Sequence, residues 1–184
     1  MSLSLAEIGT LYLERGRSQY GGEAVSQIEH ALQCAELADQ AGESEATVAA
    51  CLLHDLGHLL AAEGRGQADE TPGVDDLHQY VPLPFLRGLL PEAVLEPIRL
   101  HVEAKRCLCS TEPGYQAQLS PTSRQSLVLQ GGPHTEAEAA QFLAQPFAPE
   151  ALRLRRYDDL AKVPGQTTRP LAHFLERLQG LVGS

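Results

Sequence analysis

Residues 46–61 read ATVAACLLHDLGHLLA, and this stretch decides the fold. Apolar residues occupy nearly every side of a helix over these positions, so the sequence predicts a central, buried helix. Three polar side chains, His54, Asp55 and His58, interrupt the apolar run. Burying an aspartate and a neutral imidazole without partners is costly in free energy. We therefore expect a metal ion or a hydrogen-bond network at this point, and we favour the metal ion.

The rest of the chain is also predicted to be helical, in a single domain covering residues 1–184. A chain of 184 residues can bury roughly 70% of the surface that it exposes when unfolded, which is enough for one ordinary core. No alternating β-branched run is present, so the predicted fold class is all-α. A loop is expected between Glu63 and Val74, followed by a short helix near 75–90 that Pro82 and Pro84 interrupt. Longer helices are expected at 25–41, 46–61, 91–108, 122–129, from Thr135 with Glu138 in a capping box, from Pro149, and at 170–181.

Charge and composition exclude several classes of function. The chain carries 24 acidic and 14 basic side chains, a formal charge of −10 with neutral histidines. Nucleic-acid binding depends on clustered Lys and Arg, so we expect no nucleic-acid partner. No apolar stretch approaches the roughly 18 to 20 residues that cross a bilayer, and the first twenty residues carry acidic groups where a signal peptide has its basic start. We expect a cytoplasmic protein with no membrane partner; the oligomeric state stays open, and a homo-oligomer is one outcome.

Two further residues complete a candidate metal site with His54 and Asp55. Neighbouring residues lie about 100° apart around a helix, so both side chains can face one space between helices. His30 and Asp158 each lie in the middle of another predicted helix. Imidazole and carboxylate groups bind iron, manganese and other divalent metals, so the donors alone do not name the metal.

The order His30, His54-Asp55, Asp158 resembles the H…HD…D pattern of the HD-domain superfamily of metal-dependent phosphohydrolases. The pattern covers nearly the whole chain, and the resemblance implies a single-domain HD-type helical bundle. By the same resemblance, His78 and His101 look like the extra ligands of the branch that binds two metals, with Asp55 as the bridging ligand.

Further motifs narrow the resemblance to one branch of that superfamily. In combination they resemble the small HD-domain oxygenases that cleave the C–P bond of hydroxylated aminoethylphosphonates and are related to myo-inositol oxygenase. Tyr20 and Glu23 are the most specific match, because ordinary HD phosphohydrolases have no such pair before the first histidine. The motifs are Tyr20-Gly-Gly-Glu23, HDLGH at 54–58, H-x-x-x-K from His101 to Lys105, SPTSRQSLVLQGGP at 120–133 and RRYDDLAK at 155–162.

The resemblance implies two iron ions, in a mixed Fe(II)/Fe(III) state, as cofactor and O2 as co-substrate. Such an enzyme acts on a small organophosphonate, a 1-hydroxy-2-(amino or trimethylammonio)ethylphosphonate. Its products are inorganic phosphate and glycine or an N-methylated glycine such as glycine betaine. One iron would be held by His30, His54, Asp55 and Asp158, and the other by Asp55, His78 and His101.

The resemblance also assigns roles to the pair that precedes the first histidine. Tyr20 would occupy the iron site in the absence of substrate, and Glu23 would attract the cationic amine of the substrate. Two glycines between them give the backbone freedom to move, which favours a mobile gate. The alternative is an ordinary flexible turn before a helix.

A dianionic phosphonate that enters an acidic protein needs local positive charge. Lys105, Arg155 and His58 each lie one helical turn from a predicted ligand, so each is expected on the side of the metal site. The alternatives are a solvated helix-end charge for Lys105 and a structural partner of a buried aspartate for Arg155. Ser123 and Ser126 either add hydroxyl donors or are plain loop residues. The residues expected to act in catalysis are Tyr20, Glu23, His58 and Lys105.

The substituent on the substrate nitrogen is left open by the sequence. A primary ammonium group would need hydrogen-bond acceptors such as Glu23, whereas a trimethylammonio group would prefer aromatic faces. Tyr20, Tyr80 and Phe85 are the candidates for such a surface.

Two other functions are compatible with much of this pattern. The first is a metal-dependent HD phosphohydrolase acting on a nucleotide or another phosphate ester, in which the metals activate water. The second is a non-catalytic metal-dependent sensor or scaffold, for which lost ligands would be expected. Tyr20 with Glu23, together with His78 and His101, favours the oxygenase.

Overall fold

A computed structural model describes residues 2–62, 73 and 75–183 of the chain. Helices are the regular elements of these ranges, and only isolated bridges, Gln19 with Ser26 and Arg87 with Leu90, pair extended backbone there. The all-α prediction is confirmed. No helix within the described ranges is both long enough and apolar enough to cross a membrane. The helices are α1 Leu5–Arg15, α2 Gln27–Gln40, α3 Glu45–Leu53, α4 Leu56–Ala62, α5 Leu83–Leu86, α6 Glu92–Thr111, α7 Tyr115–Gln118, α8 Pro121–Leu129, α9 Glu136–Leu143, α10 Ala148–Leu160 and α11 Leu171–Gln179.

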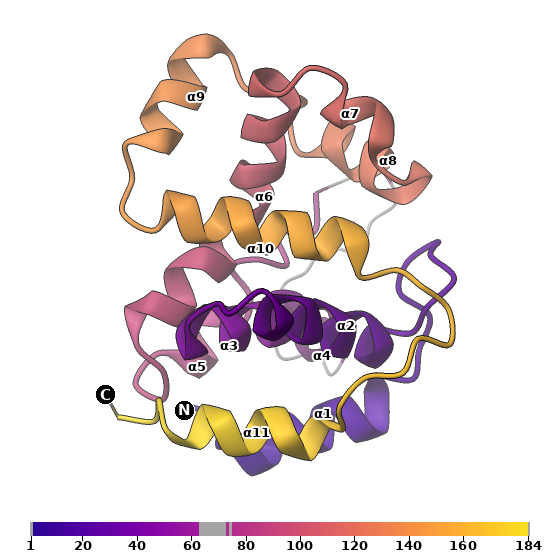
Figure 1. Ribbon diagram of the computed structural model, residues 1–184, viewed down its shortest axis with the longest axis vertical. Helices are drawn as coiled ribbons and strands as arrows, with labels where there is room; N and C mark the ends of the chain where they lie inside the picture. Colours follow the sequence, from indigo (N-terminus) through magenta and orange to yellow (C-terminus); the bar gives the residue numbers. More distant parts are fainter. Residues whose placement is uncertain (1, 63–72, 74, 184) are drawn as a thin grey trace.

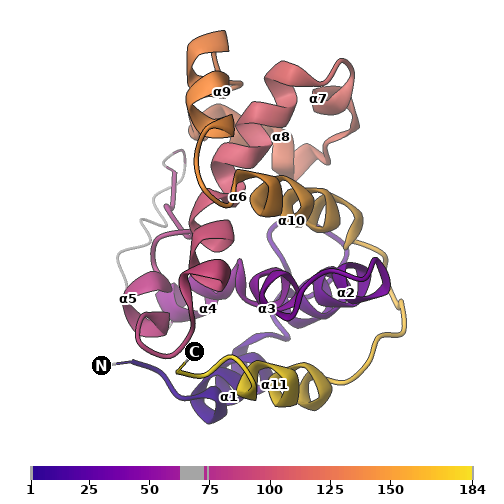
Figure 2. The same cartoon turned by 60° about the vertical axis from the view of Figure 1, so that its left-hand side comes forward.

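The helices are arranged in tiers around α3. Figures 1 and 2 show α2 and α3 in the middle, with α10 above them and with α1 and α11 side by side below. Helix α6 packs against both α10 and α3 and so connects the middle tier to the upper one, where α9 also contacts it. Val48 to Leu53 of α3 are at most 1% exposed, as the apolar sequence predicts for a central helix.

Side-chain caps fix where several helices begin. Thr135 and Glu138 form the predicted capping box at the start of α9. The same box forms at α2 from Ser26 and Glu29. It also forms at α1, where the hydroxyl of Ser4 accepts the N–H of Glu7. Each box satisfies backbone N–H groups that the helix itself leaves unpaired.

The helix predicted over 46–61 is wrong in one respect, because the structure divides it into α3 and α4 at His54 and Asp55. The Nδ1 atom of His54 lies 2.9 Å from the carbonyl oxygen of Cys51. That oxygen would otherwise accept the N–H of Asp55 within a continuous helix. The imidazole competes for this acceptor, and the chain turns where the polar pair occurs. The same contact of His101 with Ile98 leaves α6 continuous, so the contact orients the ring but does not by itself end the helix.

Other element boundaries differ less from the predictions. The predicted loop from Glu63 to Val74 lies, apart from Gly73, outside the described residues. Over 75–90 the only helix is α5, and the rest of that segment consists of turns and extended chain. Helix α6 continues three residues beyond the predicted end at Leu108, and α1 and α7 were not predicted.

Candidate metal centre

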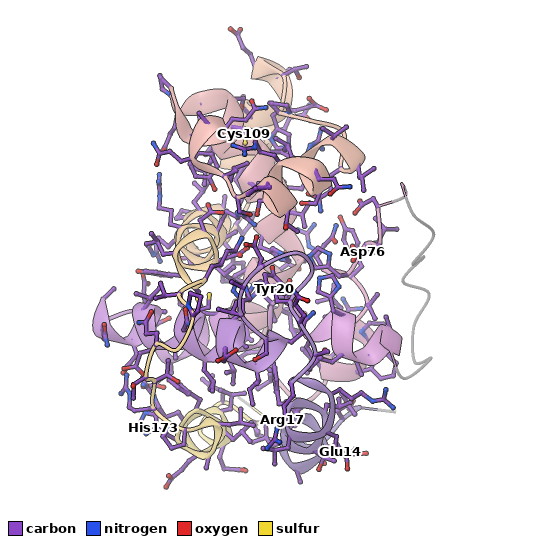
Figure 3. All side chains as sticks on the ribbon, turned by 90° about the vertical axis from the view of Figure 1, so that its right-hand side faces the viewer. Glu14, Arg17, Tyr20, Asp76, Cys109 and His173 are labelled. Carbon is purple, nitrogen blue, oxygen red and sulfur yellow. The ribbon has the colours of Figure 1, made fainter. Side chains whose placement is uncertain are left out.

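Six buried histidine and aspartate side chains from different parts of the fold converge between the middle and upper tiers. All of them are at most 8% exposed. Figure 3 shows Tyr20 and Asp76, which flank this cluster, near the middle of the molecule. The six are His30 on α2, His54 and Asp55 at the junction of α3 and α4, His78 before α5, His101 on α6 and Asp158 on α10.

Backbone carbonyl groups fix the orientation of three of the four histidine rings. The Nδ1 atom of His30 lies 2.8 Å from the oxygen of Ala161, and that of His101 lies 2.7 Å from the oxygen of Ile98. His54 makes the corresponding contact with Cys51 at 2.9 Å. A carbonyl oxygen only accepts, so each Nδ1 carries the proton. Each neutral ring then presents the lone pair of its Nε2 atom to the cluster.

The fourth ring, His78, is held by a carboxylate. Its Nδ1 lies 2.6 Å from Oδ1 of Asp76, which makes Nδ1 the donor and leaves Nε2 as an acceptor when the ring is neutral. Partners of this kind, behind a metal-binding histidine, fix its tautomer and raise its basicity. The other oxygen of Asp76 lies 3.1 Å from Nδ1 of His58. Asp76 thus holds two neighbouring rings, which stack with centroids 4.3 Å apart.

One set of donors surrounds Oδ2 of Asp55. The Nε2 atoms of His30 and His54 are 3.3 Å apart, and they lie 3.7 and 3.3 Å from Asp55 Oδ2. Asp158 Oδ1 is 3.4 Å from the Nε2 of His30. Ligands at about 2.1 Å from a shared metal are separated by about 3.0 to 3.4 Å in octahedral or tetrahedral geometry. The spacing of these atoms therefore suits a metal ion.

A second set of donors surrounds the other oxygen of the same carboxylate. The Nε2 atoms of His78 and His101 are 3.1 Å apart, and they lie 3.4 and 3.7 Å from Asp55 Oδ1. The Nε2 of His58 is 3.9 Å from this oxygen as well. Each oxygen of Asp55 thus faces a different set of imidazoles, as a bridging carboxylate would.

Electrostatics indicate that the cluster attracts positive charge. Oδ2 of Asp55 and Oδ1 of Asp158 are buried without a hydrogen-bond partner. Burial alone would lower the pKa of His54, but Asp55 outweighs it and raises that pKa to about 10. Burial and the neighbouring His78 hold the pKa of His101 well below its ordinary range, so this ring stays neutral. A divalent metal bound here would displace the proton from His54 and satisfy both carboxylates.

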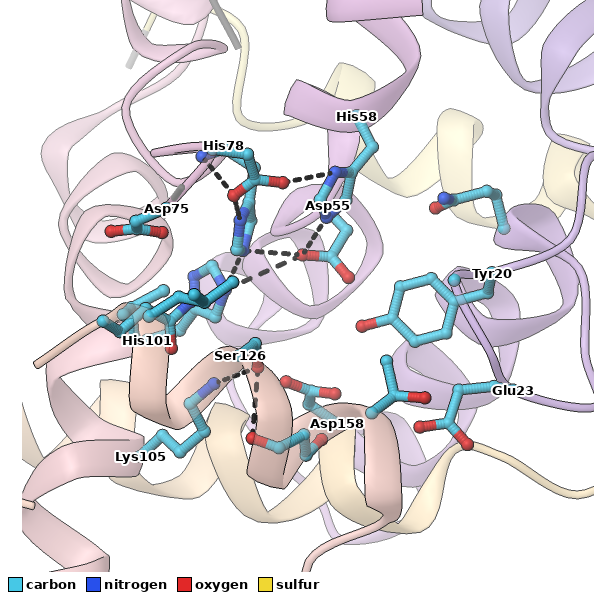
Figure 4. A pocket seen from close by; sticks show the side chains of 18 of the residues that line it. Tyr20, Glu23, Asp55, His58, Asp75, His78, His101, Lys105, Ser126 and Asp158 are labelled. Atoms are coloured by element: carbon cyan, nitrogen blue, oxygen red, sulfur yellow. Dashed lines mark hydrogen bonds and ion pairs between the residues drawn. The ribbon is translucent and has the colours of Figure 1, made fainter. Parts of the chain in front are cut away.

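Tyr20 lies directly against this cluster. Its ring stacks on His30 with a centroid distance of 4.1 Å and an angle of 10° between the planes. Burial, followed by the charge of Asp55, raises the pKa of its phenol well above the ordinary range. Figure 4 shows the hydroxyl directed toward the site, with Glu23 beside it.

Two glycine positions permit close approaches that shape the site. A Cβ atom on Gly57 would lie 2.1 Å from the carbonyl oxygen of His78, so the HDLGH glycine lets the His78 segment pack on α4. A Cβ atom on Gly22 would lie 2.9 Å from the hydroxyl of Thr122, at the start of α8. The segment after Tyr20 is thus packed against α8 in this structure.

A cavity of about 530 Å³ opens beside the histidine and aspartate cluster. Tyr80 and Phe85, which were considered as aromatic contacts, do not line it, whereas Tyr20 does. The predicted substrate and catalytic residues all line this one space: Tyr20, Glu23, His58, Lys105, Ser123, Ser126 and Arg155.

Lys105 is the most unusual cation of the cavity. It is 3% exposed, and its Nζ donates to Ser126 Oγ at 2.8 Å. It forms no ion pair with any described carboxylate. Burial, and then repulsion from Arg155, lower the pKa of Lys105 to about 7. A solvated helix-end charge, the alternative reading of this residue, does not match a side chain so deeply buried.

Arg155 is engaged with protein carboxylates instead. Its guanidinium donates to Oδ2 of Asp158 and to Oδ1 of Asp159. It also reaches the hydroxyl of Ser123 at 3.4 Å. The structure therefore shows the structural partnership with a buried aspartate that the sequence left open, in a side chain that also lines the cavity.

Two cavity residues were missed by the sequence analysis. Lys162 lies 3.3 Å from Glu23, and it follows Asp158 by four residues, so the spacing rule that selected Arg155 also points to it. Asp76 precedes His78 by two residues. An aspartate so close to a candidate histidine ligand could have indicated this role, because carboxylates commonly accept the second ring N–H of metal-binding imidazoles.

A family model of the HD domain matches residues 28–160. The chain belongs to the HD-domain family. The matched range contains all six clustered histidines and aspartates, so the fold and the cluster agree with membership.

Curated relatives of this HD-domain chain are similar along most of their length. A [1-hydroxy-2-(trimethylamino)ethyl]phosphonate dioxygenase (glycine-betaine-forming) of Leisingera caerulea is 36% identical over 95% of this chain and 88% of the relative. A hydroxymethylphosphonate dioxygenase of Gimesia maris is 44% identical over 89% of this chain and 81% of the relative. An uncharacterised protein of Acanthamoeba polyphaga mimivirus is 32% identical over 89% and 75%. The predicted resemblance to phosphonate-cleaving HD oxygenases is confirmed.

Proposed function

We propose that this HD-domain protein is a dioxygenase that cleaves the C–P bond of a 1-hydroxyalkylphosphonate. The reaction consumes one O2 per substrate and forms a carboxylic acid and inorganic phosphate: for hydroxymethylphosphonate, formic acid and phosphate balance all atoms. The two dioxygenases named above act on a trimethylamino-substituted and on an unsubstituted hydroxyphosphonate. A substrate bearing an amino or trimethylammonio group, as the sequence analysis expects, forms glycine or glycine betaine.

The metal ions are proposed to be iron. His30, His54, Asp55 and Asp158 would hold one ion, and Asp55, His78 and His101 the other. The support for this assignment is the pair of donor sets, one on each oxygen of Asp55, with nitrogen and oxygen donors only. A mixed-valent iron pair bound there would supply the redox chemistry that activates O2.

One observation carries the proposal. Lys105 is buried without a carboxylate partner in the described part of the chain, and it lines the same cavity as the two sets of imidazole and carboxylate groups that could each bind a metal ion. A phosphonate dianion entering this cavity would receive charge-assisted hydrogen bonds from Lys105 Nζ. It would also raise the fraction of Lys105 that is protonated, because an adjacent negative charge favours the ammonium form. Ser126, which accepts from Lys105 now, would keep the ammonium oriented.

Other cavity residues are proposed to bind and orient the substrate. His58, held by Asp76 through Nδ1, lines the cavity with its Nε2 3.9 Å from Oδ1 of Asp55, where it can contact a substrate oxygen beside the metal centre. Arg155 fixes Asp158 and directs part of its charge toward Ser123. Tyr20 covers His30 and would be displaced when the substrate binds, and Glu23 would attract a cationic substituent.

Parallel measurement of O2 consumption and phosphate release tests the function. Iron-loaded protein should release phosphate from hydroxymethylphosphonate or 1-hydroxy-2-(trimethylammonio)ethylphosphonate in air, with one O2 consumed per phosphate. Without O2, release should stop. Equal rates of phosphate release with and without O2, or release only from phosphate esters, would identify a hydrolase instead.

A further inference from the structure

Glu23, the carboxylate proposed to attract a cationic substituent, already has two partners in the structure. Its Oε1 accepts a hydrogen bond from Ser120 and lies 3.3 Å from Lys162 Nζ. The side chains of Glu23 and Lys162 are only 11% and 12% exposed. Because solvent screens such a pair weakly, its attraction exceeds that of an ion pair on the open surface.

Lys162 also contacts the aromatic ring of Tyr20, next to Glu23. Its Nζ lies over the Tyr20 ring, 5.8 Å from the centroid, within the range of a cation–π contact. His30 stacks on this ring as well. The Nζ further donates to Ser123 Oγ at 3.1 Å. A quaternary ammonium group seeking an aromatic face would therefore compete with Lys162 for Tyr20.

The remaining described carboxylates of the cavity lie elsewhere. Asp55 and Asp158 face the clustered histidines, and Asp76 is bound to two imidazoles. Asp75 lies on the His78 side of the cavity, across from Glu23 and Tyr20 (Figure 4). On the Tyr20 side, the described part of the chain thus offers one carboxylate for a substrate cation, and Lys162 holds it.

We infer that Lys162 is a specificity-determining residue, which competes with a cationic substrate substituent for Glu23 and Tyr20 and so lowers the preference for ammonium-bearing phosphonates. This inference rests on the proposed function. A phosphonate without a cationic substituent leaves the Glu23–Lys162 pair intact. A cationic one must displace the lysine or accept the repulsion of a nearby like charge.

Three compounds separate charge from size. They are 1-hydroxy-2-(trimethylammonio)ethylphosphonate, its isostere with a neutral tert-butyl group, 1-hydroxy-3,3-dimethylbutylphosphonate, and hydroxymethylphosphonate. The ratio of kcat/KM for the cation to kcat/KM for the isostere measures recognition of the charge alone. Lys162→Met should raise this ratio at least tenfold, which corresponds to about 1.4 kcal/mol. Lys162→Arg, which keeps the charge, should leave the ratio close to that of the wild type.

Glu23→Gln provides the second half of a double-mutant cycle. In the Lys162→Met background it should abolish the gain, because the freed carboxylate is the proposed receptor. An unchanged ratio in Lys162→Met, or a gain that survives Glu23→Gln, would overturn the inference.

Dissociation constants of the same three compounds, measured anaerobically by calorimetry, decide the inference even if turnover fails. The same shift in the ratio of affinities is expected. Absence of O2-dependent phosphate release from all three compounds in iron-loaded wild type would contradict the proposed function, while the binding ratios would still test the role of Lys162.

Discussion

Replacing Lys105 with methionine should make the protein more stable and nearly inactive. The ammonium is buried at 3% exposure, and burial together with Arg155 lowers its pKa from 10.5 to about 7. A change of this size corresponds to about 4 kcal/mol of destabilisation at pH 7, because the unfolded chain holds the proton more tightly. Methionine has a similar length, fills the same space and carries no charge.

The net gain in stability is smaller than this electrostatic contribution. The variant loses the hydrogen bond from Nζ to Ser126, which contributes about 1 kcal/mol. We therefore expect the free energy of unfolding at pH 7 to rise by about 1 to 3 kcal/mol. The protein keeps a charged group at a point where folding alone would favour an apolar one, as is common at functional sites.

The dependence on pH separates this explanation from simple repacking. Lys105 has a lowered pKa in the folded state, so the unfolded state binds more protons between the two pKa values and wild-type stability rises with pH there. The advantage of Lys105→Met should consequently shrink by about 3 kcal/mol between pH 7 and pH 9.5. Urea unfolding of chelator-treated protein at both pH values measures it.

Activity and a matched control complete this test. Loss of a buried charged partner costs about 2 to 5 kcal/mol, so kcat/KM for a phosphonate should fall at least 30-fold. Lys162→Met is the control for stability, because that lysine has a carboxylate partner, so its removal leaves Glu23 without its cation and should not stabilise the protein. A Lys105→Met variant that is less stable than the wild type at both pH values, or that keeps full activity, would refute the reasoning.

Three further predictions concern the metal centre. His78→Ala should lower the iron content from close to two to about one per chain while the fold survives. His173→Ala, outside the cluster, should leave the iron content unchanged. Elemental analysis measures the iron, and circular dichroism checks the fold. Gly57→Ala should reduce iron binding and destabilise the fold by about 1 to 3 kcal/mol, because the new Cβ would lie 2.1 Å from the His78 carbonyl oxygen. Gly180→Ala is the control, because its new Cβ would make only ordinary van der Waals contacts. Tyr20→Phe should lose activity faster during storage in air if the phenol protects the iron, and equal half-lives would contradict that role.

The sequence predicted those parts of the site that depend on local pattern. The polar residues inside the apolar run of α3 and α4 predicted a metal ion or a hydrogen-bond network. The structure brings five further imidazole or carboxylate groups to them, those of His30, Asp76, His78, His101 and Asp158. Capping boxes were equally local signals: Thr135 with Glu138 was used, while the identical signal at Ser4 and Glu7 was overlooked, and α1 was missed. These features were readable because the residues that cooperate lie within one turn of each other.

The remaining features depend on contacts that sequence spacing does not contain. The chain turns at His54, whose ring contacts the Cys51 carbonyl, whereas the same contact of His101 with Ile98 leaves α6 continuous, so sequence spacing alone does not say which histidine lies at a helix break. Lys162 matters because α10 ends beside the segment of Tyr20 and Glu23, which is more than a hundred residues earlier in the chain. His30, His54, Asp55 and Asp158 could be proposed from side chains on predicted helices, and His78 and His101 only through the family resemblance. The charge balance of the substrate cavity could not be predicted in this way, because it depends on which cation each carboxylate contacts. That pairing distinguishes Lys105, which is free to bind a phosphonate, from Lys162, which is paired with Glu23.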